Sequence, residues 1–250
     1  MRVIKIGGNV VDSVERRAAL LDAIATSGLP TVLVHGGGKL ATELAERLNV
    51  PQTLVDGRRI TDAETLRIVT MVYGGLINKT LVAELQARGV NAIGLAGADG
   101  NLMLAHRRVH AERDYGFVGD VDTVNITLLT MLTEAGYTVV CAPLTHDGAG
   151  TLLNTNADTI AREIAVALSA TAETELSYIF EHAGVLRDVN NASSAFPQLS
   201  RADAQDGVAQ GVITAGMLPK LENAFAAAER GVARVRITRW DDLDGGTQIV

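Results

Sequence analysis

Short apolar runs alternate with longer amphipathic segments along most of the chain. Runs such as TVLV and YTVVCAP are continuously apolar, which is typical of parallel strands covered by helices on both faces. The alternation of strand and helix predicts an α/β fold: an open, mainly parallel sheet between two helical layers, a three-layer αβα arrangement with right-handed crossovers. The predicted strands are Arg2–Ile6, Thr31–Val34, Asn91–Leu95, Thr138–Ala142, Leu176–Phe180 and Ala233–Thr238. The predicted helices are Val14–Ser27, Lys39–Leu48, Leu76–Arg88, Thr127–Ala135, Asp158–Leu168 and Met217–Glu229.

The β-α rhythm is interrupted between about residues 101 and 121. There NLMLAHRRVH and GFVGDV predict a β-hairpin excursion beside the sheet. A polar stretch at 190–194 predicts a surface loop, and no low-complexity linker divides the chain. We therefore expect a single domain over residues 1–250, with an N-terminal lobe of about 1–170 and a C-terminal lobe of about 171–250.

Charge and cysteine content exclude several classes of protein. The 250 residues carry a net charge of −7, and Lys and Arg are scattered, whereas a nucleic-acid binder concentrates them in a basic patch. The single cysteine, Cys141, lies in an apolar run and predicts a buried strand thiol rather than a disulfide or a metal site. The N-terminus shows no signal peptide, and no apolar run approaches the ~20 residues of a membrane helix. We expect a cytoplasmic protein.

Two predicted strands end in glycines, KIGGN at 5–9 and HGGGK at 35–39. A glycine turn that leads into a helix points backbone N–H groups at a ligand, so this pair predicts an anion site. Neither turn is G-x-G-x-x-G, and Leu40 follows Lys39 where a P-loop needs Ser or Thr. The HGGG of lipase-like hydrolases requires a G-x-S-x-G elbow, which this sequence lacks.

Four polar positions are candidates for the chemistry. Lys5 interrupts an apolar strand, where burial is costly without an anionic partner. Asn154 and Asp158 are four residues apart and share a helix face if the helix begins early enough, although Asn154 or Asn156 is also a natural cap. Lys220 follows Pro219 in the first turn of a helix, where the dipole disfavours a cation.

The segment DGRRIT adds two adjacent arginines. One of Arg58 and Arg59 suits a solvated surface charge, and the other suits a bidentate clamp on a carboxylate.

These segments, in order along the whole chain, resemble the amino acid kinase family. The resemblance is carried by KIGGN, VHGGGKLATEL, VDGRRIT, INKTLVAEL, AIGLAGADGNL, YGFVGDV, LLNTNADTIA, GVITAGMLPKLENA and GGTQIV. VHGGG followed by GRRIT is closest to the acylglutamate kinases and their aminoadipate relatives. The resemblance implies ATP-dependent phosphorylation of the γ-carboxylate of N-acetylglutamate, an early step of arginine biosynthesis, with Mg²⁺, in a homodimer.

The resemblance also implies roles for single residues. Lys5 and Lys220 would stabilise charge and Asp158 would organise them. Acylglutamate would be bound by Gly37, Gly38, Arg59 and Asn154. ATP would be bound by Gly7 and Gly8 and by Glu181, Gly184, Leu186, Val212, Ile213 and Thr214. No side chain is assigned to the metal.

Two features depart from the family pattern. The family commonly has Thr-Asp-x-x-Gly where this chain has Phe180-Glu181-His182-Ala183-Gly184, so the nucleotide contacts should differ. An N-terminal helix that resembles the arginine-sensing element of feedback-inhibited members is not seen, which predicts insensitivity to arginine.

Three alternatives stay open from the sequence. The acyl cap could be succinyl, the substrate could be a carrier-linked aminoadipate, or the protein could be a non-catalytic amino-acid sensor with the same fold.

Overall fold

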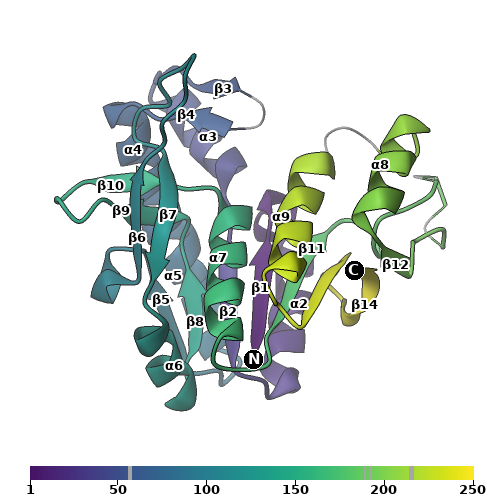
Figure 1. Ribbon diagram of the computed structural model, residues 1–250. Helices are drawn as coiled ribbons and strands as arrows, with labels where there is room; N and C mark the ends of the chain where they lie inside the picture. Colours follow the sequence, from purple (N-terminus) through teal and green to yellow (C-terminus); the bar gives the residue numbers. More distant parts are fainter. Residues whose placement is uncertain (56–57, 189, 192, 214–216) are drawn as a thin grey trace.

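An eight-stranded sheet runs through the centre of the molecule (Figure 1), in the strand order β12-β14-β13-β11-β1-β2-β8-β5. The computed structural model describes residues 1–55, 58–188, 190–191, 193–213 and 217–250. The six predicted strands are confirmed, and neighbouring members among them pair in parallel. The strands are β1 Arg2–Ile6, β2 Thr31–His35, β5 Ala92–Leu95, β8 Thr138–Cys141, β11 Glu175–Phe180, β12 Gln198–Leu199, β13 Arg234–Arg239 and β14 Asp242–Ile249. The sequence reading missed β12 and β14; β14 returns antiparallel to β13 through a tight turn.

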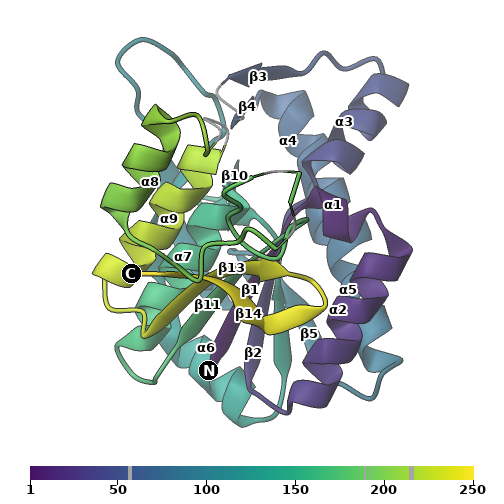
Figure 2. The ribbon, with the colours of Figure 1, turned by 90° about the vertical axis from the view of Figure 1, so that its right-hand side faces the viewer.

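Helices cover both faces of this sheet (Figure 2). In β1, Val3 packs into one core cluster and Ile4 and Ile6 into the other, because successive side chains of a strand point to opposite faces. The face of Val3 is covered by α6 Ile126–Glu134, α7 Ala157–Ser169, α8 Arg201–Ala209 and α9 Leu218–Glu229. The opposite face is covered by α1 Gly8–Val11, α2 Val14–Ser27, α3 Gly38–Arg47, α4 Ala63–Val69 and α5 Asn78–Gln86. The predicted three-layer α/β fold is confirmed.

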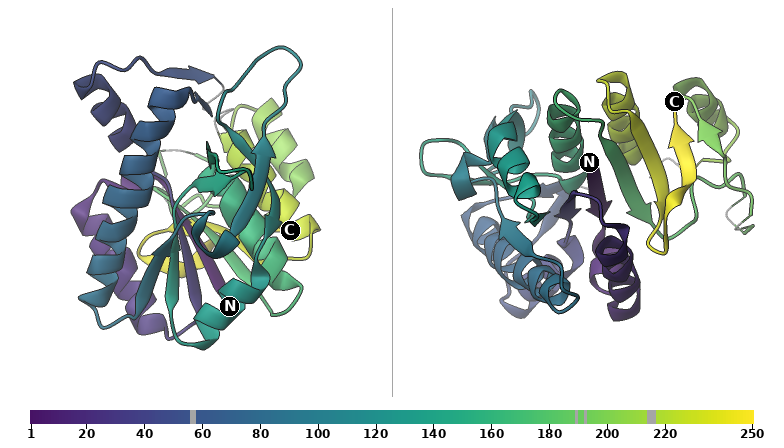
Figure 3. Two further views of the ribbon diagram at one scale, coloured as in Figure 1. Left: turned by 90° about the vertical axis from the view of Figure 1, so that its left-hand side faces the viewer. Right: turned by 90° about the horizontal axis from the view of Figure 1, so that it is seen from below.

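One helical stretch is longer than the sequence predicted. The expected helix at 76–88 begins at Ala63, because α4 continues through a π-helix, η1 Thr70–Ile77, into α5 (Figure 3). By length and composition alone this 24-residue stretch could cross a membrane, contrary to the expectation that no segment comes near that length. Its residues Ile68, Val72 and Leu81 are buried against the rest of the chain, as in a core helix.

The predicted excursion at 101–121 is confirmed as part of a second sheet of four strands. The strands are β6 Met103–Arg107, β7 Gly119–Val124, β9 Leu144–His146 and β10 Leu152–Asn154, in the order β10-β9-β6-β7. β6 and β7 pair antiparallel, and of GFVGDV only the part from Gly119 belongs to a strand. A small hairpin, β3 Thr53–Val55 and β4 Arg58–Ile60, and a 3-10 turn, η2 Asp99–Asn101, complete this end.

Local signals fix several helix ends. Ser13, Asn125 and Asn156 cap α2, α6 and α7 with their side chains. The sequence reading missed α8, although Ser200 and Asp203 form a capping box at its start. Of the predicted loop at 190–194, the described residues lie at the surface and Ala192 lies outside them. Cys141 is fully buried, as predicted, and burial raises the pKa of its thiol to about 12.

Candidate active site

Lys5 forms an ion pair with Asp158 inside the molecule. Lys5 lies two residues after Val3 on β1, so its side chain points to the same face, toward α7. Lys5 Nζ lies 2.7 Å from Asp158 Oδ1, and the two side chains are only 9% and 13% exposed. The structure thus supplies the anionic partner that the buried lysine was expected to need.

Asp158 is held by the start of α7. The Asn156 side chain accepts hydrogen bonds from the backbone N–H groups of Asp158 and Thr159, and the Tyr178 hydroxyl donates to the Asp158 carbonyl at 3.1 Å. Asn156 is therefore the cap. The expectation that Asn154 and Asp158 share a helix face is wrong, because α7 begins at Ala157 and Asn154 belongs to β10. Both side chains nevertheless line the same cavity.

The two glycine turns lie side by side at the carboxyl ends of β1 and β2, which are neighbours in the sheet. Gly36 N–H donates to the Ile6 carbonyl at 2.8 Å, and Gly37 precedes the first turn of α3. A Cβ on Gly37 would lie 2.2 Å from Ile77 Cδ1, so a side chain here requires Ile77 to move, and the φ of 159° also favours glycine. The glycines of both turns line one cavity at this edge of the sheet, which is the place that the sequence predicted for an anion.

His35 supports the second turn from below. Its ring is fully buried, which lowers the pKa of the imidazole to about 4. The neutral ring fits the surrounding groups: Nδ1 lies 2.8 Å from the Gly36 carbonyl, to which it can donate, and Nε2 lies 3.4 Å from Asn78 Nδ2. Asn78 donates in turn to the Val140 carbonyl at 2.9 Å. His35 thus links the turn to β8.

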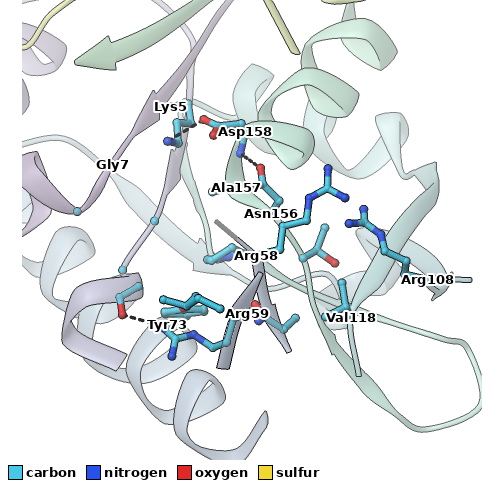
Figure 4. Close-up of a pocket in the computed structure, with 18 residues that line it drawn as sticks. Lys5, Gly7, Arg58, Arg59, Tyr73, Arg108, Val118, Asn156, Ala157 and Asp158 are labelled. Carbon is cyan, nitrogen blue, oxygen red and sulfur yellow. Dashed lines mark hydrogen bonds and ion pairs between the residues drawn. The ribbon is translucent and has the colours of Figure 1, made fainter. Parts of the chain in front are cut away.

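A cavity of about 250 Å³, which we call the arginine-lined cavity, opens above the glycine turns (Figure 4). Its charged lining is three arginines and one lysine against a single carboxylate, that of Asp158. Figure 4 shows Lys5 and Asp158 together on one side of it, Arg59 beside Tyr73 on another, and Arg108 apart from both. The lining residues that carry polar groups are Lys5, Gly7, Gly8, Gly36, Gly37, Gly38, Arg58, Arg59, Tyr73, Arg108, Asn154, Thr155, Asn156 and Asp158. This excess of positive charge suits a small anion with more than one carboxylate.

The predicted arginine clamp has a fixed guanidinium. Arg59 is 8% exposed and donates to the Gly38 carbonyl at 2.9 Å and to Thr42 Oγ1 at 2.8 Å, while Gln52 accepts from its other end. Arg58 is the exposed member of the pair. Arg108, which the sequence reading missed, is held by Asp120, whose pKa the Arg108 hydrogen bond lowers.

A second cavity, which we call the Lys220 cavity, also borders the first glycine turn and measures about 410 Å³. It shares Lys5, Gly7 and Gly8 with the arginine-lined cavity. The remaining members are Asn9, Val10, Ile179, Phe180, Glu181, His182, Met217 and Lys220. Lys220 is the third residue of α9, in its first turn as predicted. The two cavities therefore meet at Lys5 and the first glycine turn.

The predicted nucleotide contacts are only partly brought together. Glu181 lines the Lys220 cavity and lies 3.3 Å from Arg16 as an ion pair. Gly184 and Leu186, which are buried, and Val212 and Ile213 are described residues that line neither cavity. Thr214 lies outside the described residues.

Comparison with known proteins decides the family. The model of the amino acid kinase family matches residues 1–239. The chain is a member of this family. It is 54% identical to an acetylglutamate kinase of Bacteroides fragilis, with 100% of this chain and 96% of that protein covered. It is 42% identical to an acetylglutamate kinase of Methanopyrus kandleri, over 97% of this chain and 96% of that protein. Among solved structures it is similar to smu.665 from Streptococcus mutans, with a TM-score of 0.84, 30% identity and coverage of 100% and 98%.

Two residues that line this kinase site, Arg108 and Tyr73, were not predicted from the sequence. Arg108 is the first residue of the 108–118 segment between β6 and β7, and nothing nearby in the sequence marks it as a ligand-facing residue. Tyr73 lies in the missed π-helix, where its ring contacts the Gly37 position. A π-helical segment inside a long helix is itself a common sign of a functional site, but periodicity in a sequence does not reveal it.

Proposed function

We propose that this amino acid kinase transfers the γ-phosphoryl group of ATP to the γ-carboxylate of N-acetyl-L-glutamate. The product would be N-acetyl-L-glutamyl 5-phosphate, an early intermediate of arginine biosynthesis. The observation that carries the proposal is the meeting of two cavities at Lys5, Gly7 and Gly8. One cavity is arginine-lined and suits the dicarboxylate acceptor, and the other ends at Lys220 and suits the triphosphate. The full-length similarity to acetylglutamate kinases supports the choice of acceptor.

The arginine-lined cavity would hold the acceptor by its charged groups. Arg59 would bind the α-carboxylate, since its guanidinium is held at the cavity wall by Gly38 and Thr42. The Asn154 side chain, which donates to Thr61 Oγ1 at 3.0 Å, would contact the amide of the substrate. Gly37 and Gly38 would receive the γ-carboxylate end. These assignments place the nucleophilic oxygen beside Lys5.

The reaction needs no general base at this site. A glutamate side chain has a pKa near ~4.3 in water, so the attacking carboxylate is already ionised at neutral pH. The barrier comes from bringing an anionic nucleophile to an anionic phosphate in line. Lys5, Lys220 and the N–H groups of Gly7 and Gly8 would stabilise the charge on the transferred group. Asp158 would fix Lys5 through the 2.7 Å ion pair.

Magnesium fits this site as a companion of the nucleotide. Among the described residues there is no group of three or more His, Cys, Asp or Glu side chains that could hold a metal ion. Mg²⁺ prefers phosphate oxygens and water with few protein ligands, so a site of this kind suits a metal that arrives with ATP. When bound, the ion would neutralise charge on the phosphates.

We expect the kinase to act as a cytoplasmic homodimer, with the acylglutamate lobe at about 1–170 and the nucleotide lobe at about 171–250. Met71 and Leu76 on η1 are 52% and 59% exposed, and they offer apolar surface for such an interface. Met71→Asp and Leu76→Asp should shift the mass in solution to that of a monomer. Leu48→Asp, at an equally exposed leucine elsewhere, serves as the control and should leave the dimer intact. A monomeric wild type would contradict the expectation.

Trapping the acyl phosphate with hydroxylamine tests the activity. The protein is incubated with ATP, Mg²⁺, hydroxylamine and, in separate reactions, N-acetylglutamate, N-succinylglutamate, glutamate and aspartate. Hydroxamate formed with N-acetylglutamate is the expected result. Product only with the succinyl compound would replace the acetyl assignment. Absence of hydroxamate with every acceptor, together with retained ligand binding, would favour the non-catalytic sensor.

A further inference from the structure

The Lys220 ammonium lies against the face of the Phe180 ring, with Nζ 4.6 Å from the ring centroid. This is the geometry of a cation–π contact. Phe180 is the last residue of β11 and Lys220 is in the first turn of α9, so the contact closes one side of the Lys220 cavity.

Lys220 has no stronger partner in the part of the chain that the structure describes: no hydrogen bond or ion pair to its Nζ is present there. Its surroundings disfavour the charge. The start of a helix is the positive end of the dipole. Burial lowers the pKa of the Lys220 ammonium, Lys5 lowers it further, and Asp158 and Glu181 act in the opposite direction. Among the described residues, the Phe180 ring face is the favourable contact that the Lys220 ammonium makes directly.

The ring is itself held in place. Phe180 lies two residues beyond Tyr178, on the same face of β11, and packs against the core cluster beneath α7 and α9. A ring that is fixed by the core cannot follow the lysine side chain, so it defines where the ammonium rests.

We infer that Phe180 is a positioning residue for Lys220, whose ammonium it holds at the triphosphate side of the cavity without neutralising it. A carboxylate in this place would pair with Lys220 and compete with the phosphates. The ring offers no charged oxygen to the ammonium, so the N–H donors that point away from the ring stay available to phosphate oxygens. The inference rests on the proposed function, because it assigns Lys220 to the transferred phosphoryl group.

Graded fluorination of Phe180 tests this role. Fluorine withdraws density from the ring face while its size changes little, so 4-fluoro-, 3,5-difluoro- and 3,4,5-trifluorophenylalanine weaken a cation–π contact in steps. We expect kcat with N-acetylglutamate to fall stepwise, by about 3- to 30-fold at the trifluoro stage, with a smaller change in the KM of N-acetylglutamate. The same series at Phe196, whose ring carries Arg187 at 4.3 Å in the same lobe, is the matched control and should leave kcat unchanged.

The pH dependence of kcat is a second test, because it would not change if Phe180 only packed against its neighbours. The charged and titratable groups that face Lys220 are Lys5 from β1, Asp158 from α7, and Glu181 and His182 after β11. A weaker ring contact stabilises the ammonium less and lowers the pKa of Lys220. The loss of kcat on the basic side should therefore begin at lower pH along the fluorination series and in Phe180→Leu, and return toward wild type in Phe180→Tyr.

A spectroscopic measurement separates this inference from the proposed activity. In protein with ¹³Cε-labelled lysine, the Lys220 ε-methylene resonance, assigned with Lys220→Arg, should be shifted upfield by the ring and lose that shift in Phe180→Leu. If hydroxamate trapping fails but this shift is present, the activity is wrong and the contact stands. If turnover of the wild type is normal, two results would each overturn the role of Phe180. One is that neither kcat nor the basic limb of its pH profile changes along the fluorination series, and the other is that the Lys220 resonance is not shifted.

Discussion

Lys5 and Asp158 are 153 positions apart in the chain, and their charged groups lie 2.7 Å apart in the fold. The contact forms because β1 lies in the middle of the sheet and α7 packs across it, with Asp158 in the first turn. Both partners are largely buried, so removal of either would leave the other as an unpaired buried charge. The ion pair stands where the arginine-lined and Lys220 cavities meet.

Removal of either lysine should lower turnover more than binding. Lys5→Ala and Lys220→Ala each delete a charge that stabilises the transferred phosphoryl group, and we expect kcat to fall by about 10²- to 10³-fold with a smaller rise in KM. Steady-state kinetics with ATP and N-acetylglutamate measure this. Lys39→Ala, at a lysine that is 67% exposed beside the second glycine turn, is the matched control and should be near wild type. Near-normal kcat in both site variants would refute the assignment.

Loss of one partner of the buried pair should cost stability. Asp158→Asn leaves the Lys5 ammonium without its anion, and we expect the free energy of unfolding to fall by about 3 kcal/mol, together with a loss of activity. The double variant Lys5→Met, Asp158→Leu replaces the pair by apolar groups and should regain most of the stability but none of the activity. Urea unfolding and kinetics on the three proteins test this. Activity in the double variant would show that the pair is structural only.

A side chain at Gly37 should destabilise the protein, and the cost should be smaller when Ile77 is shortened. A Cβ at Gly37 would lie 2.2 Å from Ile77 Cδ1, and we expect Gly37→Ala to cost about 1–3 kcal/mol and to raise the KM of N-acetylglutamate. Ile77→Val removes that Cδ1, so the same glycine substitution should cost less in the Ile77→Val background. Thermal unfolding of the four variants of this cycle measures the coupling, and strict additivity would contradict the expectation. Gly75→Ala, with no atom within 4 Å of its Cβ, is the control.

Acidification should destabilise the protein through His35. The folded-state pKa is lowered from 6.5 to about 4 by burial, so the unfolded chain binds the proton first as pH falls. The contribution of His35 to the free energy of unfolding is fully present above pH 6.5 and is lost as pH falls toward 4, by about 3 kcal/mol in total. His35→Gln should flatten this part of the curve of unfolding free energy against pH. His110→Gln, at an exposed histidine, should leave the curve unchanged.

The strands and helices of the main sheet could be predicted from the sequence because they depend mostly on residues that are close together in the chain. Apolar runs predicted the six strands of the parallel sheet, and the glycine turns predicted where the site would lie, at the carboxyl ends of β1 and β2. The cap of α7 also acts on residues two and three positions away, and the neighbouring residues narrowed it to Asn154 or Asn156, of which Asn156 is the cap.

The tertiary structure alone decided how the distant parts meet. It placed Asn154 on a strand rather than on α7, fixed Arg59 through Gly38 and Thr42, and added Arg108 from the segment that follows β6. It also set the Lys220 ammonium on the Phe180 ring, a contact between a strand end and a helix start 40 positions apart. Sequence periodicity reports which face of an element is buried, whereas these contacts depend on which elements pack together and in what register. Lys5 could be singled out from its strand, but its partner could be measured only in the fold.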